Sequence, residues 1–339
     1  LTIDSHHALL LALTCADEGS LIIFRDTDAD TFCETGETVV HDLYISPIDS
    51  APVDLSCITE ITGQVEMEFS KATSIDISNA VSIADGLNIH DNYDTDTIDF
   101  TSLVSVGDGF TLNNNRDLEI LVIDSIETIG GQFEVNSNGS LSTLSAPNLD
   151  TIEGSLRFSS NSGIEEVSFD SLVNLEGDFR FEHNHYVESV ALPAVNEVQG
   201  QMYIYNNDRL ETIVFSGLTE VSSSLEIQYN SQVASVDLTS LQSVNGTFQM
   251  YSLNEMEELN LAALQEVNGS FTVNNCNSLL SLSAPVFDDL SGSLTIRDNT
   301  DLASIDLTSL TCVDDYTIVG NDMDDDDVRD LLLHIISTC

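Results

Sequence analysis

A repeat of 23 residues is the feature of this sequence that most limits what the chain can fold into. An apolar residue recurs at this interval without a slip, and a second apolar residue follows each one two places later. Side chains two residues apart point to the same face of a strand, so each repeat contains a strand with one buried face. The first column consists of Leu87, Phe110, Phe133, Leu156, Phe179, Met202, Leu225, Phe248, Phe271 and Leu294.

An asparagine column runs through the same repeats, five places after the first apolar column, with Leu253 and Cys276 as exceptions. Stacked asparagine side chains can hydrogen-bond the backbone of neighbouring turns, so we expect this column to be buried. We therefore expect Cys276 to be a small buried thiol of low reactivity. The column consists of Asn92, Asn115, Asn138, Asn161, Asn184, Asn207, Asn230 and Asn299.

These columns predict an all-β fold, because no helical pattern of ten residues fits inside a repeat, whereas short strands joined by tight corners do. We expect a parallel β-solenoid of about 12 turns, in which each turn buries its neighbours. Residues 1–40 form an N-terminal cap, residues 41–320 form the repeats, and residues 321–339 form a C-terminal cap. Acids at 324–327, followed by Val328, Leu331, Leu332 and Ile335, predict a short amphipathic capping helix.

The charge is strongly acidic, with 58 acids against 8 bases and a net charge of −50. Nucleic acid and anionic membrane surfaces are poor partners for such a chain, because like charges repel. Its self-repulsion is weaker at high salt, which favours a saline or cation-rich setting, although the charge could also serve solubility alone. No apolar run is long enough for a membrane span.

Six cysteines lie mostly near the two ends of the sequence, and none forms a Cys-x-x-Cys pair. This clustering predicts disulfides in the caps and an oxidising, extracellular compartment. We expect Cys312 to pair with Cys339 and to fix the C-terminal helix, whereas the pairing of Cys15 stays open. Three possible N-glycosylation sites agree with an extracellular location: Asn138, Asn245 and Asn268.

The unit Gly-x-Phe-x-Val-x-x-Asn-x-x-Leu-x-x-Leu resembles the receptor L domain, a leucine-rich-repeat-like β-solenoid. That family includes the ligand-binding lobes of the insulin and epidermal growth factor receptors, with relatives among fungal and bacterial surface proteins. Residues 33–36 and 55–65 resemble its opening cysteine and its first full turn. Over about residues 33–339 the resemblance implies a right-handed solenoid and a Cys33–Cys57 disulfide. The chain has more turns, lacks a cysteine-rich module and is far more acidic, so growth-factor binding is not implied.

An acidic segment near the N-terminus has the spacing of a calcium-binding loop. Its acids occupy loop positions 1, 3, 5, 9 and 12, as in an EF-hand, although Thr31 replaces the usual glycine at position 6. A solvated charge run is the alternative explanation. No cofactor is otherwise required, and Ca²⁺ is the candidate metal, with Asp26, Asp28, Asp30, Glu34 and Glu37 as its ligands.

We expect the chain not to be an enzyme. The repeats from residue 87 onward keep their length without insertions, so no loops wall a cleft, and the common hydrolase and nucleotide-binding motifs do not occur.

Tyrosines mark a candidate interaction patch, because five of the eight tyrosines fall within residues 186–251. Tyrosine combines a rigid apolar ring with a polar tip, which suits both sugars and protein interfaces. Its preference for strands could explain one or two of these residues, but not the whole group. The predicted patch consists of Arg180, His183, Tyr186, Tyr203, Tyr205, Tyr229 and Tyr251, with His185 beside them.

Two functions fit these features. The chain could be a structural or adhesive protein of the cell surface that assembles with itself into an extracellular filament. Alternatively, it could be a binding module that recognises a glycan or a protein through the tyrosine patch.

Overall fold

A computed structural model describes residues 19–46, 48, 51–311, 313 and 315–336, without the side chains of residues 325 and 336. The chain forms two compact units. Unit 1 comprises Leu1–Gly154 and Asn161–Gly163, and unit 2 comprises Ser155–Ser160 and Ile164–Cys339.

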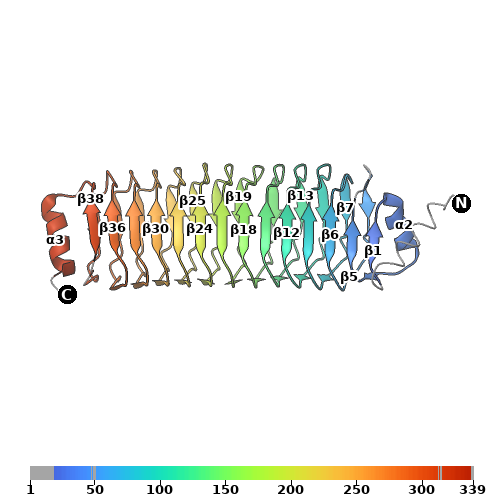
Figure 1. Cartoon of the computed structure of the whole chain (residues 1–339), viewed down its shortest axis with the longest axis horizontal. Coiled ribbons are helices and arrows are strands. Elements are labelled where there is room, and N and C mark those ends of the chain that lie inside the picture. The colour runs from blue at the N-terminus through green and yellow to red at the C-terminus, as the bar shows by residue number, and fades with distance from the viewer. Residues whose placement is uncertain (1–18, 47, 49–50, 312, 314, 337–339) are drawn as a thin grey trace. The chain divides into compact units, whose positions relative to one another are not determined.

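Unit 1 is a coil in which each turn contributes short parallel strands to faces that we call A, B and C (Figure 1). Face A contains β1 (Leu21–Ile23), β3 (Leu43–Ile45), β6 (Val65–Glu68), β9 (Leu87–His90), β12 (Phe110–Asn113) and β15 (Phe133–Asn136). Face B contains β2 (Val39–Val40), β5 (Glu60–Ile61), β8 (Ser82–Ile83), β11 (Ser105–Val106), β14 (Thr128–Ile129) and β17 (Thr151–Ile152). Face C contains β4 (Val53–Asp54), β7 (Ser74–Asp76), β10 (Thr97–Asp99), β13 (Ile120–Val122) and β16 (Thr143–Ser145).

Unit 2 repeats the same arrangement. Face A contains β18 (Leu156–Ser159), β21 (Phe179–Glu182), β24 (Met202–Tyr205), β27 (Leu225–Gln228), β30 (Phe248–Tyr251), β33 (Phe271–Asn274), β36 (Leu294–Arg297) and β38 (Tyr316–Val319). Face B contains β20 (Asn174–Leu175), β23 (Glu197–Val198), β26 (Glu220–Val221), β29 (Ser243–Val244), β32 (Glu266–Val267) and β35 (Asp289–Leu290). Face C contains β19 (Glu166–Ser168), β22 (Ser189–Ala191), β25 (Thr212–Val214), β28 (Ser235–Asp237), β31 (Glu258–Asn260), β34 (Ser281–Ser283) and β37 (Ser304–Asp306).

The two apolar columns of the sequence form the interior, as predicted. On nearly every four-residue strand of face A the first and third side chains are buried, and the second and fourth point outward. Strand pairing in register stacks identical positions, so Phe110 lies 5.0 Å from Phe133 and Phe248 lies 4.8 Å from Phe271, ring centre to ring centre. The fold is therefore an all-β parallel β-solenoid, with about 13 turns in the two units together.

The asparagine column forms a hydrogen-bonded ladder inside each unit, which confirms its predicted role. The Asn138 side chain accepts a hydrogen bond from the Asn115 backbone N–H (3.1 Å) and donates one to the Leu112 carbonyl (3.0 Å). Each amide thus satisfies a donor and an acceptor of the preceding turn, both of which would otherwise be buried and unpaired. Alternation of asparagine with cysteine at this position is typical of leucine-rich repeats, and Cys276 takes the asparagine's place here.

A corner follows the outward end of each four-residue strand of face A. From β6 to β36 its first residue adopts a left-handed backbone conformation, with φ between 51° and 58°. Asparagine, aspartate and serine fill most of these corners, because they tolerate this conformation better than bulky residues do. Besides His183, Phe69 and Tyr229 are the aromatic residues among them, and both of these side chains are exposed.

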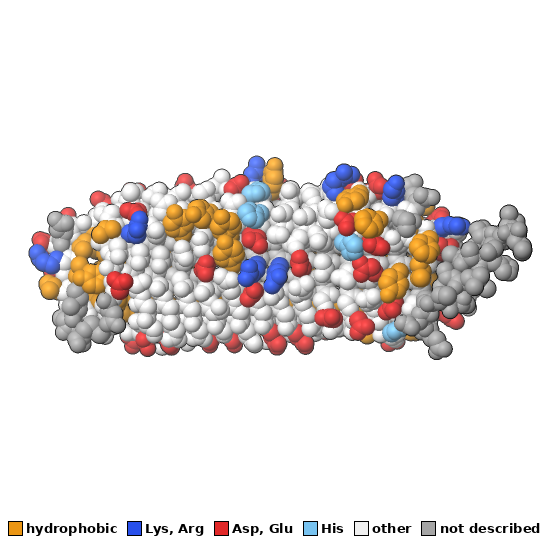
Figure 2. All heavy atoms as spheres, viewed as in Figure 1, with side chains coloured by type: hydrophobic (Ala, Val, Ile, Leu, Met, Phe, Trp, Pro, Cys, Tyr) orange, Lys and Arg blue, Asp and Glu red, His pale blue; other side chains and the backbone are white. Residues whose placement is uncertain are grey.

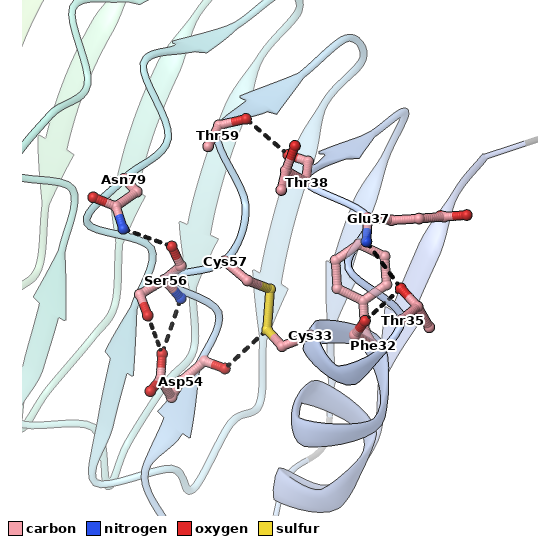
Figure 3. The surroundings of a disulfide bond; sticks show 10 residues. All are labelled: Phe32, Cys33, Thr35, Glu37, Thr38, Asp54, Ser56, Cys57, Thr59 and Asn79. Atoms are coloured by element: carbon pink, nitrogen blue, oxygen red, sulfur yellow. Dashed lines mark hydrogen bonds between the residues drawn. A yellow bond between two sulfur atoms is a disulfide. The ribbon is translucent and has the colours of Figure 1, made fainter.

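The N-terminal cap contains helix α2 (Asp26–Glu34) and one disulfide. The Asp28 carboxylate fixes the helix start by accepting hydrogen bonds from the backbone N–H groups of Phe24 (3.1 Å) and Arg25 (2.9 Å). Cys33 in the last turn of α2 is bonded to Cys57, just beyond β4, as the family resemblance implied (Figure 3). The disulfide ties the helix to the second turn of the coil.

The C-terminal cap contains helix α3 (Asp325–Ile336), as the acids and the apolar spacing predicted. Ile335 is fully buried, and the ring nitrogen Nε2 of His334 lies 2.9 Å from the Thr308 carbonyl oxygen. The predicted Cys312–Cys339 disulfide and Cys15 lie outside the described residues.

Candidate functional site

The candidate site is the outward surface of face A in unit 2, where the predicted tyrosines come together on neighbouring strands. Tyr203 and Tyr205 are the two outward residues of β24, and Tyr251 ends β30. Tyr229 lies between them at the left-handed corner after β27 and is 45% exposed. Figure 2 shows hydrophobic side chains gathered over these strands, with histidine and basic side chains next to them.

The four tyrosine rings form one continuous row of contacts. The Tyr203 and Tyr205 rings stack at 5.5 Å with an angle of 10° between their planes. The Tyr229 ring stands at a steep angle to both of its neighbours, 5.4 Å from the Tyr205 ring and 4.9 Å from the Tyr251 ring. Rings that hold one another in this way lose little further freedom when a ligand binds, so the row is a preorganised surface.

Two histidines and a fifth tyrosine lie next to the row, at and just after the corner that follows β21. The His183 ring lies 5.5 Å from the Tyr205 ring and 6.1 Å from the His185 ring. Next to them the Tyr186 ring is 47% exposed and carries the Arg209 guanidinium 4.8 Å above its centre. Arg180 lies in register with Tyr203 on the adjacent strand. Strand register and ring contacts therefore connect six of the seven predicted patch residues, and the seventh, Tyr186, contacts Arg209.

The tyrosine tips differ in what they bind. A hydrogen bond to Tyr251 raises the pKa of Tyr229. Burial, followed by the nearby Tyr205, Glu182 and Glu226, raises the pKa of Tyr203. Within the part of the chain that the structure describes, the hydroxyl groups of Tyr203 and Tyr205 have no hydrogen-bond partner. Both groups are therefore available to a ligand as donors and acceptors.

The surroundings of the row are polar. On strands β18 to β33 of face A, all of which are described in full, no outward side chain is aliphatic. The outward residues beside the tyrosines include Glu226, Gln228 and Gln249. Aromatic rings among amide and carboxylate groups offer stacking faces together with directional hydrogen bonds.

A second aromatic cluster, which the sequence analysis missed, occupies face A of unit 1. Its members are Phe69, His90 and Tyr93, with Arg116 6.0 Å from the centre of the Tyr93 ring. The Phe69 ring meets the His90 ring edge to face at 6.2 Å, although Phe69 remains 49% exposed. These residues occupy different places in successive repeats, so no column of the sequence marks them.

The polar atoms of this cluster are bonded to one another. His90 lies between the carboxylates of Glu66 (2.6 Å) and Asp91 (3.1 Å), and Asp91 also accepts from the Tyr93 hydroxyl (2.8 Å). Burial lowers the pKa of His90, but hydrogen bonds to Asp91 and Glu66 outweigh it and raise the pKa above its usual value. Hydrogen bonds from Tyr93 and His90 lower the pKa of Asp91. The network therefore favours a charged His90 beside an ionised Asp91.

The acidic segment predicted as a calcium loop has a different structure. Asp26, Asp28, Asp30 and Glu34 belong to helix α2, and Glu37 lies beyond its end. At about 100° and 1.5 Å per residue, Asp26, Asp30 and Glu34 follow one side of the helix over about 12 Å, and Asp28 points to the opposite side, so these acids do not surround one ion as the ligands of a calcium loop do. Asp28 is already occupied as the helix cap. The described residues contain no group of three or more histidine, cysteine or acidic side chains placed to hold a metal ion.

The three predicted glycosylation sites have unequal surroundings. Asn138 is fully buried as a ladder residue, so in the folded protein its side chain is out of reach, and that prediction is wrong for the native state. Asn245 and Asn268 are exposed at equivalent corners of successive turns, with their side chains 3.1 Å apart.

Cys276 is fully buried and has no disulfide partner, as predicted. Burial raises the pKa of its thiol to about 11, which keeps the thiol protonated and poorly reactive.

Comparisons with known proteins add little to this description. No protein-family model matches the sequence, and no curated protein matches it either. Among solved structures, the crystal structure of the TLR13–ssRNA13 complex is similar at 12% identity with a TM-score of 0.26, covering 84% of this chain. This chain spans only 63% of that structure's length, and at so low a TM-score the likeness supports no argument about function. None of the described helices is both long and apolar enough to cross a bilayer.

Proposed function

We propose that this protein is a non-enzymatic, extracellular adhesive protein that binds a glycan through the tyrosine row of unit 2. The observation that carries the proposal is the unbroken series of ring contacts from Tyr203 through Tyr205 and Tyr229 to Tyr251. Solenoids commonly use such extended flat faces to bind ligands.

A glycan suits this surface better than a protein does. Sugar rings present C–H faces that stack on aromatic rings, and their hydroxyl groups need hydrogen-bond partners around those rings. The outward residues next to the tyrosines are amides and acids such as Gln228 and Gln249, and the free Tyr203 and Tyr205 hydroxyls add two more partners. A protein interface would instead favour a dry apolar centre, for which this surface has no aliphatic side chains.

The extracellular and non-enzymatic parts of the proposal rest on different observations. The Cys33–Cys57 disulfide supports an oxidising compartment. The binding face is an open sheet of in-register strands, to which ligands have access without an enclosing cleft. Such a face suits binding and adhesion more than the desolvated environment that most catalysis requires.

The test is a triple substitution of Tyr203, Tyr205 and Tyr251 by serine, with Tyr316→Ser as a matched control outside the row. Binding to a panel of immobilised neutral and uronate-containing oligosaccharides should fall at least tenfold in the triple variant and stay unchanged in the control. Circular dichroism and the thermal midpoint should show that both variants remain folded.

Two outcomes would overturn the proposal. In the first, the native protein binds no member of the panel. In the second, the triple variant binds as the native protein does. If sedimentation showed that the triple substitution dissolves an oligomer while the panel stays empty, the row would be an interface between copies of this chain.

A further inference from the structure

Two arginines occupy adjacent strands at the edge of the tyrosine row. Arg157 on β18 and Arg180 on β21 are register partners, and both side chains point outward, 42% and 37% exposed. Basic residues are scarce in this chain, with 8 against 58 acids. Like charges opposite one another on neighbouring strands repel, so the pairing is locally unfavourable without an anion.

One carboxylate serves both guanidinium groups. Asp178 lies 3.2 Å from Nε of Arg180 and 3.8 Å from Nη2 of Arg157. Its other oxygen accepts a hydrogen bond from the Gln201 backbone N–H (2.9 Å). Two positive charges therefore share a single, already occupied negative charge, which leaves the pair with about one net positive charge.

Several arginine donors remain unused. The Arg180 side chain is held on both sides, because its Nη2 also donates to the Gln201 side-chain oxygen (3.2 Å). The Nε of Arg157 is buried and has no hydrogen-bond partner in the described structure. A guanidinium has five N–H donors, so Arg157, with one long contact to Asp178, has the most capacity left.

The pair continues directly into the tyrosine row. Register pairing places Arg157, Arg180 and Tyr203 at the same position of three consecutive strands. On the far side of Tyr203 the next residue in register is Glu226, whereas Glu182 ends β21, the strand of Arg180, and pairs in register with Tyr205. Along this one outward position the charge thus changes from positive at Arg157 and Arg180 to negative at Glu226, which gives a bound ligand one orientation.

We propose that Arg157 and Arg180 bind the carboxylate of an acidic sugar whose neighbouring rings lie on the tyrosines. This inference rests on the proposed glycan-binding function and adds the class of glycan, a uronate-containing oligosaccharide. Guanidinium and carboxylate fit each other through paired, charge-assisted hydrogen bonds. The net charge of −50 repels densely charged polyanions, so the site selects an isolated or terminal acid.

The experiment compares a neutral oligosaccharide that carries one terminal galacturonate with the methyl ester of the same compound, which has the same rings without the charge. The native protein should bind the acid at least tenfold more tightly, and added salt should reduce the difference. The double variant R157Q/R180Q should lose this preference and keep its affinity for the ester. R297Q, which alters an outward arginine on β36, is the control and should behave as the native protein.

The outcomes separate this inference from the proposed function. Equal binding of acid and ester by the native protein would overturn the acidic-sugar site and leave the glycan-binding proposal standing. An acid preference that survives in R157Q/R180Q would also overturn the site. If neither probe binds in this test or on the oligosaccharide panel, both proposals fail.

Discussion

The two aromatic clusters use the same positions of the repeat, yet they differ in how their polar atoms are satisfied. Phe69 in unit 1 and Tyr229 in unit 2 both occupy the left-handed corner, and His90 and Tyr205 both end a strand of face A. In unit 1, Glu66, His90, Asp91 and Tyr93 bond to one another, so the cluster is closed. In unit 2 the Tyr203 and Tyr205 hydroxyls lack partners among the described residues. Under the proposed function, the free hydroxyl groups of Tyr203 and Tyr205, and not the presence of aromatic rings alone, distinguish the row from the unit 1 cluster.

The largest expected effect concerns the buried side chains of the two units. It tests whether the loss of one buried phenylalanine ring destabilises both units equally. Phe110→Ala in the interior of unit 1 and Phe179→Ala in the interior of unit 2 should each lower the free energy of unfolding by about 3–5 kcal/mol, because each leaves a cavity. The outward neighbours give the controls, and Thr111→Ala and Arg180→Ala should cost no more than about 1 kcal/mol. Chemical denaturation measures all four, and equal losses for inward and outward residues would contradict the register.

An intermediate effect concerns the pH dependence of stability. It should be present for the hydrogen-bonded network around His90 in unit 1 and absent for the tyrosine row in unit 2. The raised pKa of His90 means that its stabilising contribution is complete below about pH 6.5 and is lost as pH rises through the folded value. The lowered pKa of Asp91 means that its contribution is complete above about pH 4 and is lost in more acidic solution. The network should therefore stabilise unit 1 most between about pH 4 and 6.5.

His90→Gln should lower the thermal midpoint more at pH 5 than at pH 8.5. The effect should correspond to about 0.2–1 kcal/mol, as for other partly exposed ion pairs. Tyr203→Ser is the control from unit 2, since the raised pKa of Tyr203 keeps its hydroxyl protonated across this range. A midpoint difference for His90→Gln that does not change with pH would show that the network does not stabilise the charged form of His90.

The smallest effect on stability should come from the two exposed aromatic corner residues. Phe69→Asn and Tyr229→Asn each relieve a left-handed backbone strain of about 1–2 kcal/mol and lose ring contacts of similar size. Both variants should unfold within about 1 kcal/mol of the native protein. Only Tyr229→Asn should weaken oligosaccharide binding, and a comparable loss in Phe69→Asn would mean that unit 1 also contributes to the binding surface.

Most of the fold could be predicted from the sequence, because stacking in register imposes the same requirement on every turn. A buried position such as Phe179 or Asn207 must be filled correctly in each repeat, so its column is visible in one sequence. The outward tyrosines could be placed by the same register. Their ring contacts, and the free state of the Tyr203 and Tyr205 hydroxyls, depend on side-chain directions that no column records.

At two places the sequence pattern fits more than one structure. Acids at alternate positions suit both a cation loop and the first turn of a helix, and in α2 the helix forms because Asp28 caps it. The Asn138 sequon and the asparagine ladder make opposite demands on one side chain, and burial decides in favour of the ladder. The unit 1 cluster was not recognised in the sequence because His90, Asp91 and Tyr93 occupy three different positions of a single repeat. They interact with one another there, but no repeated column contains them together.

The asparagine ladder also has a mechanical consequence for a protein under load. Within each unit the strand pairs and ladder bonds connect one turn to the next, so a force that separates neighbouring turns loads these bonds one turn at a time. A detached turn of 23 residues would release about 80 Å of extended chain before the next turn feels the full force. An adhesive tether built in this way would lengthen in regular steps and dissipate a sudden pull, while the turns not yet detached keep their folded surface.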